Sequence, residues 1–247
     1  MSVPAPTTIA YGPHPDQIYD RWDPDGRTEA AGLTVAFVHG GFWRAEYDRT
    51  HAVPAALAFA RAGFQVALLE YRRVGTHGGG FPGTARDVVA GLTALCADPT
   101  LAPVVAVGHS AGGHLVAWAA SADRVPRLRG AVTLAGVVDL AAGDRLALGD
   151  WAIRDFLGGS PAQEPQAWAD ADPARHRLTT PMTVLCGALD SDVPPQVSRE
   201  YVGNRGPGQA PCRLVEVANA GHFELIDPGH PAFAEVIRAV SAFRGYC

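Results

Sequence analysis

The 247-residue chain predicts an α/β fold with a mostly parallel central sheet and helices on both faces. Three observations support this. Short apolar runs alternate with helix-like segments, as in repeated strand-helix units. The runs are nearly continuous in apolar residues, which is typical of strands buried on both faces. Glycine-rich turns follow several runs. Ligands of such sheets bind beyond the carboxyl ends of the strands, so we expect the chemistry in the loops that follow them.

In chain order, two weak strand-like pieces come first, around residues 8–11 and 17–22. The second alternates polar and apolar residues in part, which predicts a half-exposed edge strand. A strand buried on both faces is expected at 33–38, and further strands are expected at 64–69, 104–107, 131–135, 182–186 and 213–217. Helices are expected at 50–61, 84–96, 110–121, 195–202 and 231–243.

We expect residues 1–247 to form one domain, because this length lies within the range of single domains. The segment from about 140 to 178 lacks strand patterning. It contains short helix-like pieces at 151–157 and 165–169. Because it interrupts the alternation of strands and helices, we expect it to be a small lid over the active site.

Charge and hydropathy exclude several classes of function. Charged residues make up 18% of the chain, the formal net charge is −5, and no basic cluster is present, so nucleic-acid binding has no electrostatic basis. Arginines and a glutamate interrupt the most apolar stretches, so no membrane span is expected. The first eight residues lack both a basic region and an apolar core. We therefore expect no signal peptide and a cytoplasmic protein.

Neither a metal nor a cofactor is expected. The four cysteines have no metal-type spacing, and the histidines do not share a helix face with carboxylates. Free thiols in a reducing compartment are the simplest interpretation. Cys186 lies in a predicted strand and Cys212 begins another, so the pattern leaves open whether the two are close. The sequence does not indicate an oligomeric state.

The sequence Gly108-His109-Ser110-Ala111-Gly112 lies between the strand at 104–107 and the following helix. In this context G-x-S-x-G places a serine hydroxyl on a sharp turn at the top of the sheet. The helix behind it directs N–H groups toward developing negative charge. The alternative is a turn whose serine only caps the helix. We predict that Ser110 is the nucleophile.

His39-Gly40-Gly41-Phe42-Trp43 follows the strand at 33–38. Glycines here allow the backbone to approach a substrate closely. We expect the N–H groups of Gly41 and Phe42 to form an oxyanion hole with the N–H of Ala111. The alternative is a glycine-rich turn with a structural histidine.

Two aspartates follow the strand at 182–186, and His222 follows the last strand. Asp190 comes first after its strand and is predicted to orient the imidazole. Asp192 is interpreted as a solvated or capping residue. His222, just past Gly221, is predicted to be the general base. Its alternative is a solvated loop histidine.

The other histidines are interpreted as solvated, exposed or packing residues. His114 is expected to support the serine turn from one helical turn below. Four aromatic residues are candidates for the substrate pocket. Phe42 and Trp43 follow the oxyanion glycines, whereas Trp151 and Phe156 lie in the predicted lid. Their placement indicates a substrate with an apolar or aryl group.

With these loops in place, the sequence resembles the α/β-hydrolase superfamily over nearly its whole length, including its chain order of serine, acid and histidine. The motifs His39–Trp43, Gly108–His114 and Gly221–Phe223 resemble the carboxylesterase and kynurenine-formamidase group related to hormone-sensitive lipases. The resemblance implies a triad of Ser110, Asp190 and His222. Phe42 replaces a third glycine common in the lipase-like loop and is closer to the aromatic residue of kynurenine formamidases.

The predicted function is metal-independent hydrolysis of a small ester or aryl formamide through an acyl-enzyme. A small peptidase of the prolyl-oligopeptidase type, with the same triad order, is an alternative; we favour it less because no propeller or other gating domain is predicted. A catalytically inactive ligand receptor is a third interpretation, and the filled triad positions argue against it.

Overall fold

The computed structural model describes residues 5–24 and 32–245. Its centre is an eight-stranded sheet in the order β1-β2-β4-β3-β5-β6-β7-β8. The pairs β1–β2 and β2–β4 are antiparallel, and all other neighbouring pairs are parallel. The strands are β1 (Thr7–Ala10), β2 (Ile18–Trp22), β3 (Thr34–Val38), β4 (Gln65–Leu69), β5 (Val104–His109), β6 (Gly130–Leu134), β7 (Met182–Gly187) and β8 (Cys212–Val217). The predicted α/β architecture is confirmed.

The second strand differs from the prediction. The expected edge strand at 17–22 is β2, but it pairs with both β1 and β4. Its residues Tyr19, Asp20 and Trp22 are therefore buried. The weakly patterned β1 forms the edge instead, and its residues are mostly exposed. Asp20 is paired by Arg49 at 2.7 Å, which explains how a carboxylate lies inside the sheet.

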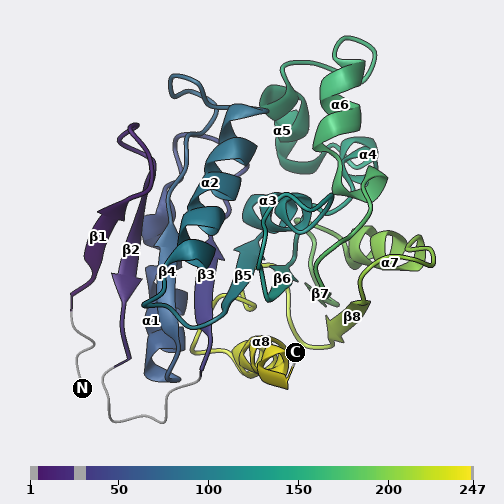
Figure 1. Cartoon of the computed structure of the whole chain (residues 1–247). Helices are drawn as coiled ribbons and strands as arrows, with labels where there is room; N and C mark the ends of the chain where they lie inside the picture. Colours follow the sequence, from purple (N-terminus) through teal and green to yellow (C-terminus); the bar gives the residue numbers. More distant parts are fainter. Residues whose placement is uncertain (1–4, 25–31, 246–247) are drawn as a thin grey trace.

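Successive residues of the central strands point to opposite faces and supply two separate cores. On β3, Ala36 and Val38 pack with α2 and α3, whereas Val35 and Phe37 pack with α1 and α8. Figure 1 shows these helix pairs on opposite sides of the sheet. Both faces are covered, which explains the continuous apolar runs in the sequence.

The helices connect the strands and cover the sheet. They are α1 (Val53–Arg61), α2 (Gly83–Ala97), α3 (Ala111–Ala119), α4 (Leu140–Arg145), α5 (Leu148–Leu157), α6 (Pro165–Ala171), α7 (Pro195–Gly203) and α8 (Ala232–Ser241), with short 3₁₀ turns at Arg49–Ala52, Pro173–Arg175 and Ala242–Gly245. The predicted helix at 50–61 thus begins as a 3₁₀ turn, and Pro54 lies in the first turn of α1. In the part of the chain that the structure describes, no helix is both long and apolar enough to cross a membrane.

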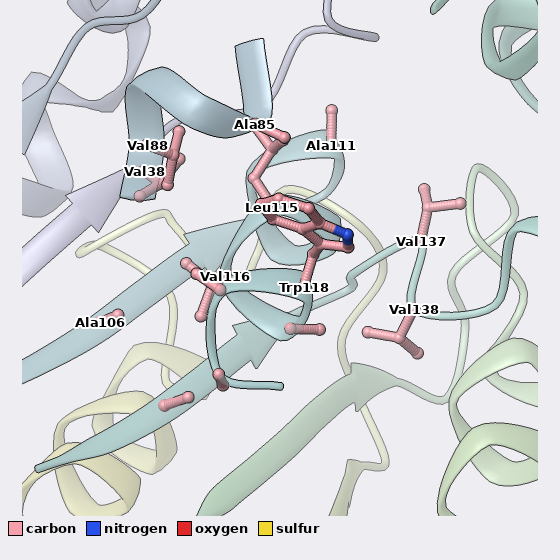
Figure 2. Close-up of a cluster of buried hydrophobic side chains, with 14 of the residues drawn as sticks. Val38, Ala85, Val88, Ala106, Ala111, Leu115, Val116, Trp118, Val137 and Val138 are labelled. Atoms are coloured by element: carbon pink, nitrogen blue, oxygen red, sulfur yellow. The ribbon is translucent and has the colours of Figure 1, made fainter. Parts of the chain in front are cut away.

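Helix α3 is the most deeply buried helix, and all nine of its residues are buried. Figure 2 shows its side chains among those of β3, α2 and the loop after β6, with Leu115 and Val116 facing Val88 and Ala106. A helix that is apolar all round needs cover on every side. The serine turn at its N-terminus is consequently anchored in the core.

Residues 140–178 form α4, α5, α6 and a 3₁₀ turn and contribute no strand to the sheet. The predicted helical pieces correspond to α5 and α6, whereas α4 was not predicted. Gly149, Asp150 and Trp151 have positive φ at the start of α5, so the chain turns sharply there. Figure 1 shows the three helices grouped together, away from α1 and α8.

The cysteines that the sequence left open are separated along neighbouring strands. Cys186 of β7 is opposite Glu216, whereas Cys212 of β8 is opposite Met182. The two positions are offset by four residues along the strands, so no disulfide can join them. Cys96, Cys186 and Cys212 are free thiols, and Cys247 lies outside the described residues.

His114 connects α3 to the end of α6. Its Nε2 lies 3.0 Å from the carbonyl oxygen of Ala171, so Nε2 carries the hydrogen of the neutral ring. The ring contacts Trp43 and Phe156 edge-on, with centroids 5.3 and 5.5 Å apart. Complete burial lowers the pKa of His114 to about 4. The supporting role predicted for this residue agrees with its position beneath the serine turn.

This burial predicts an acid-dependent loss of stability that His114→Gln should reduce. The unfolded chain binds a proton at His114 near pH 6.5, whereas the folded chain does so near pH 4. Stability is therefore lost as the pH falls through this window, by about 2 kcal/mol between pH 7 and pH 4.5. Urea unfolding at both pH values should show a loss smaller by about that amount in the variant. His77→Gln, at an exposed position, is the matched control. Equal pH dependence in all three proteins would contradict the prediction.

Candidate active site

Ser110 lies between β5 and α3 with φ 54° and ψ −118°. A non-glycine residue in this region is strained, and such strain is found mostly at functional sites. Backbone hydrogen bonds fix the turn: the N–H of Ser110 donates to Leu134, and its carbonyl accepts from His114 and Val137. The serine is thus held at the carboxyl end of the central strand.

The glycines around Ser110 allow backbone to pack directly against backbone. A Cβ on Gly108 would lie 2.2 Å from the carbonyl oxygen of Gly112, and one on Gly112 would lie 2.2 Å from that of Val38. A Cβ on Gly113 would lie 2.6 Å from the Cα of Gly136. No side chain fits at these positions, so α3 approaches the end of β3 and the loop after β6 as closely as main chains allow.

Asp190 and His222 come from the loops after β7 and β8 and form a buried pair. His222 Nδ1 lies 2.9 Å from Asp190 Oδ2. The other oxygen of Asp190 accepts the N–H groups of Asp192 and Val193 at 2.9 and 2.8 Å. These bonds fix the carboxylate, which in turn fixes the tautomer of His222 with its hydrogen on Nδ1. Nε2 is then the nitrogen able to accept a proton.

Asp192 differs from Asp190 in the way expected from the sequence. Its side chain is exposed and makes no hydrogen bond to His222 among the described residues. One ligand atom from each of Asp190, Asp192 and His222 lies within 4.8 Å of the others. Asp190 already accepts three hydrogen bonds, so its oxygens are poorly placed to coordinate a cation. This cluster is better explained as a His–Asp pair with a nearby solvated carboxylate.

Two cavities meet at the serine. Both are lined by the same four residues: Phe42, Ser110, Asp192 and His222. The inner cavity measures about 10 Å³ and is completed by Trp43, Ala111, Val137, Leu148, Ile153 and Val193. The outer cavity measures about 320 Å³ and is completed by Gly41, Tyr47, His51, His109, Phe223 and Ile226.

Ser110 and His222 share both cavities without a direct hydrogen bond between their side chains. Ser110 Oγ makes no hydrogen bond within the described part of the chain. Catalytic hydrogen bonds are often long or misaligned when no substrate is bound. The structure therefore brings the predicted nucleophile and base to one site. Among the described residues, Ser110 Oγ has no hydrogen-bond partner there.

The predicted oxyanion loop has an unusual backbone. Gly41, Phe42 and Trp43 have φ values of 107°, 56° and 57°. A Cβ on Gly41 would lie 2.3 Å from that of Tyr47, so glycine is required there. Within residues 5–24 and 32–245, no acceptor pairs with the N–H groups of Gly41, Phe42 or Ala111. These three donors remain available to a negatively charged oxygen.

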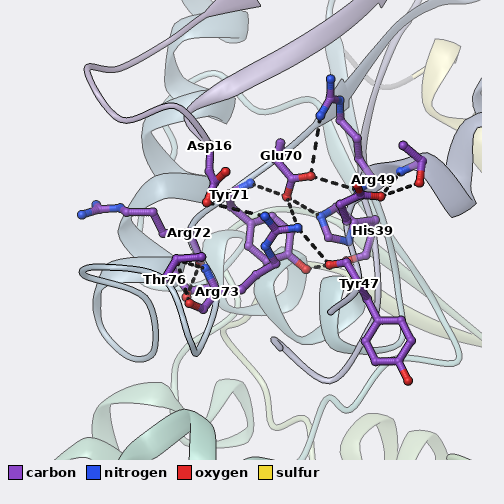
Figure 3. Close-up of polar contacts among 12 residues, drawn as sticks. Asp16, His39, Tyr47, Arg49, Glu70, Tyr71, Arg72, Arg73 and Thr76 are labelled. Atoms are coloured by element: carbon purple, nitrogen blue, oxygen red, sulfur yellow. Dashed lines mark hydrogen bonds and ion pairs between the residues drawn. The ribbon is translucent and has the colours of Figure 1, made fainter. Parts of the chain in front are cut away.

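A buried ionic network lies beneath this loop (Figure 3). His39 Nε2 lies 2.9 Å from Glu70 Oε1, and its Nδ1 lies 2.7 Å from the carbonyl oxygen of Gly40. The ring stacks on Tyr71 with centroids 4.4 Å apart, and the Tyr71 hydroxyl donates to the carbonyl of His39. Arg73 pairs with Glu70 at 3.0 Å and donates to the carbonyl of Tyr47. The network thus fixes both ends of the loop.

Glu70 is the centre of this network and remains ionised. Burial alone would raise the pKa of Glu70, but the hydrogen bond and charge of His39, the charge of Arg73 and the N–H of Arg49 lower it below its usual value. Sequence reasoning missed Glu70, Tyr71 and Arg73. A signal was present, because these polar residues directly follow the strand at 64–69, at the functional end of the sheet.

The predicted pocket residues separate into two pairs. Phe42 lines both cavities and Trp43 lines the inner one, as expected. Phe156 lies outside both linings, fully buried and stacked on Trp43 with centroids 4.8 Å apart. Trp151 also lies outside them; it is 41% exposed, with the Arg154 guanidinium 3.7 Å from its ring centroid. Phe156 therefore supports the pocket from behind, and Trp151 is a surface residue.

His109, within the serine motif, was expected to pack and is fully buried. Its Nε2 lies 3.1 Å from the carbonyl oxygen of His222, and the two rings are 4.6 Å apart. Burial, together with the nearby His222, holds the pKa of His109 well below its usual value. A neutral His109 donates from Nε2 and so positions the loop of His222.

Comparison with known proteins agrees with this architecture. Residues 56–243 match the model of the prolyl oligopeptidase family. An esterase of Thermogutta terrifontis superposes with a TM-score of 0.75 at 21% identity, over 99% of this chain and 94% of that one. A truncated carbohydrate esterase from gut microbiota gives a TM-score of 0.78 at 18% identity, over 96% and 95%. These structures share the fold.

The predicted α/β-hydrolase superfamily is thereby confirmed. The matching family is the prolyl oligopeptidase family, whose peptidases were an alternative prediction from the sequence. The family match covers about three quarters of the chain, including Ser110, Asp190 and His222. The chain is a serine hydrolase of the prolyl oligopeptidase family, built on the α/β-hydrolase fold.

Proposed function

We propose that this protein hydrolyses a small carboxylic ester or an aryl formamide, with Ser110 as nucleophile, His222 as general base and Asp190 as its orienting acid. One observation carries the proposal. The buried Asp190–His222 pair and the uncommitted hydroxyl of Ser110 line the same cavities. Gly41, Phe42 and Ala111 also line this site, and their N–H groups, which have no acceptor in the described part of the chain, are the proposed oxyanion hole.

Acylation begins when Ser110 Oγ attacks the carbonyl carbon and passes its proton to His222 Nε2. The carboxylate of Asp190 stabilises the resulting imidazolium. The carbonyl oxygen becomes an oxyanion and accepts hydrogen bonds from the proposed donors, each worth about 2.7–4 kcal/mol in the transition state. His222 then gives its proton to the leaving oxygen or nitrogen, and the bond to the carbonyl carbon breaks.

Deacylation repeats the same steps with water. His222 removes a proton from water, whose oxygen attacks the acyl-enzyme. A second oxyanion forms at the same N–H groups. When it collapses, His222 returns the proton to Ser110 Oγ and the carboxylic acid is released. Every proton transfer uses groups of this chain.

Several solved structures support an ester as the substrate. Thermogutta terrifontis esterase 2 is described as phosphonylated by sarin and phosphorylated by paraoxon, and another structure of it contains bound propionate. Organophosphates react with activated nucleophiles of serine esterases. These structures are 19–22% identical to this chain and share its fold.

The segment 140–178 is proposed to act as the lid of one hydrolase domain. Leu148 and Ile153 of this segment line the inner cavity beside Ser110. The Trp118 indole donates to the carbonyl of Asp170, which joins the far end of the segment to α3. These contacts support a position of the segment over the proposed chemistry. Small lids of this kind exclude water from the reaction.

Family membership favours a second candidate, cleavage of short peptides after proline. The same triad would serve both reactions. A peptide such as an acyl-Gly-Pro anilide distinguishes them, because its acyl side contains a pyrrolidine ring. We favour the ester or formamide because of the narrow inner cavity described above.

A paired assay on the purified protein tests the proposal. One arm contains p-nitrophenyl esters from acetate to octanoate, and the other contains N-formylkynurenine. We expect hydrolysis in at least one arm, and a loss of kcat of about 10³-fold or more in Ser110→Ala, because the nucleophile is removed. Circular dichroism verifies that the variant is folded. Near-normal turnover by Ser110→Ala would refute the mechanism.

The two aspartates form a matched pair of variants. Asp190→Asn should lower kcat by about 10⁴-fold, because an amide favours the wrong tautomer of the imidazole. Asp192→Asn should lower it less than about tenfold on a neutral substrate, because the exposed side chain of Asp192 makes no hydrogen bond to His222 among the described residues. Steady-state kinetics on the better substrate measures both. Equal losses would show that Asp190 has no special part in the reaction.

A further inference from the structure

The two cavities at Ser110 differ in size and openness in a way that constrains the substrate beyond its reaction class. The inner cavity has room for about one water molecule, at about 10 Å³. The outer cavity is about 320 Å³. Because both include Ser110 and His222, the carbonyl carbon of a substrate lies where they meet. Its two substituents then point into different cavities.

Building on the proposed function, we propose that the inner cavity receives the acyl group and the outer cavity receives the leaving group, so the preferred substrates are acetyl or formyl derivatives of a large, apolar, uncharged alcohol or amine. Leu148 and Ile153 set the acyl length. Tyr47, Phe223 and Ile226 contact the leaving group.

The path of release supports this assignment. A leaving group departs to solvent before water attacks, so its cavity must be open. Tyr47 and Phe223 on the outer cavity are 47% and 61% exposed. The acyl group stays bound to Ser110 during this exchange, so its cavity can be closed. Trp43, Ile153 and Val193 on the inner cavity are each at most 4% exposed.

The position of the general acid also supports it. The leaving atom must take a proton from His222. The outer cavity is lined by Phe223 and Ile226 from the chain just after His222, and by His109, whose ring packs 4.6 Å from that of His222. The inner cavity instead contains Ala111, directly after Ser110, and Val137, whose N–H donates to the carbonyl of Ser110.

The lining charges exclude an anionic leaving group. Asp192 is the one acidic residue among the described residues of the outer cavity, and no arginine lines it. The chain contains no lysine. A carboxylate on the leaving group would have no cationic partner there and would face Asp192. Aromatic walls at Tyr47 and Phe223 favour a neutral aryl group instead.

The packing behind the inner cavity explains why it is small. Trp43 is fully buried and stacked on Phe156, so its side chain cannot move away from the cavity without disrupting the core. Leu148 and Ile153 of α5 also line this cavity. Ile153 is buried and Leu148 is half-buried, so shortening either removes atoms without exposing a charge. These two side chains are therefore the ones to change.

The experiment compares kcat/KM for p-nitrophenyl acetate, propionate, butyrate and hexanoate. We expect the wild type to lose about tenfold or more from acetate to butyrate, because a closed pocket rejects added methylenes. Ile153→Ala and Leu148→Ala should raise the butyrate-to-acetate ratio about tenfold. Two variants are used because one could lose stability, and thermal melts monitor both.

Ile226→Ala is the matched control on the outer cavity. It should keep the butyrate-to-acetate ratio of the wild type and reduce the preference for 1-naphthyl acetate over methyl acetate. The effect of a charged leaving group is tested with phenyl acetate and 4-carboxyphenyl acetate. We expect kcat/KM to be at least about tenfold lower for the anionic ester. Asp192→Asn should reduce this difference in kcat/KM.

The outcomes separate this inference from the proposed function. If no ester is hydrolysed in a manner that depends on Ser110, the proposed function fails. If esters are hydrolysed but kcat/KM is independent of acyl length, the assignment of the inner cavity is wrong. If Ile226→Ala, rather than Ile153→Ala or Leu148→Ala, extends the acyl range, the two cavities are assigned in reverse.

Discussion

The structure depends on the direct backbone-to-backbone contacts that glycines allow around Ser110. Gly108, Gly112 and Gly113 bring α3 against β3, β5 and β6 at distances that exclude any side chain. This contact holds Ser110 at a positive φ that costs on the order of 1–3 kcal/mol. The surrounding core compensates for that cost, because α3 is buried along its whole length. The hydroxyl is thereby presented at one fixed point of the sheet edge.

Everything else at the site is positioned relative to that point. Parallel strands end at the same edge, so the loops after β3, β7 and β8 converge on Ser110 although they lie far apart in sequence. The loop after β3 has three consecutive positive φ values and would be unstable alone. Beneath it, the ionised carboxylate of Glu70 and its partners His39 and Arg73 supply the compensating bonds. They stabilise a backbone in which the N–H groups of Gly41 and Phe42 have no acceptor among the described residues.

Much of this architecture could be predicted from the sequence, because buried parallel strands and G-x-S-x-G each have a strong local pattern. Other features depend on contacts between distant segments. The partial alternation of residues 17–22 predicted a half-exposed edge strand, and the pattern could not show that Arg49 pairs with Asp20. Glu70 and Arg73 look like ordinary loop charges until the fold brings His39 to them. Phe156 and Trp151 are both aromatic residues of α5, yet the turn at residues 149–151 places one in the core and the other at the surface.

The central claim is that this fold activates Ser110, and covalent labelling tests it most directly. The wild-type protein and Ser110→Ala would be incubated with paraoxon, then analysed by intact mass and peptide mapping. We predict one diethylphosphoryl group per wild-type chain, located on the peptide that contains Ser110, and none on the variant. An unlabelled wild-type chain, or a label elsewhere with Ser110 unmodified, would contradict the account.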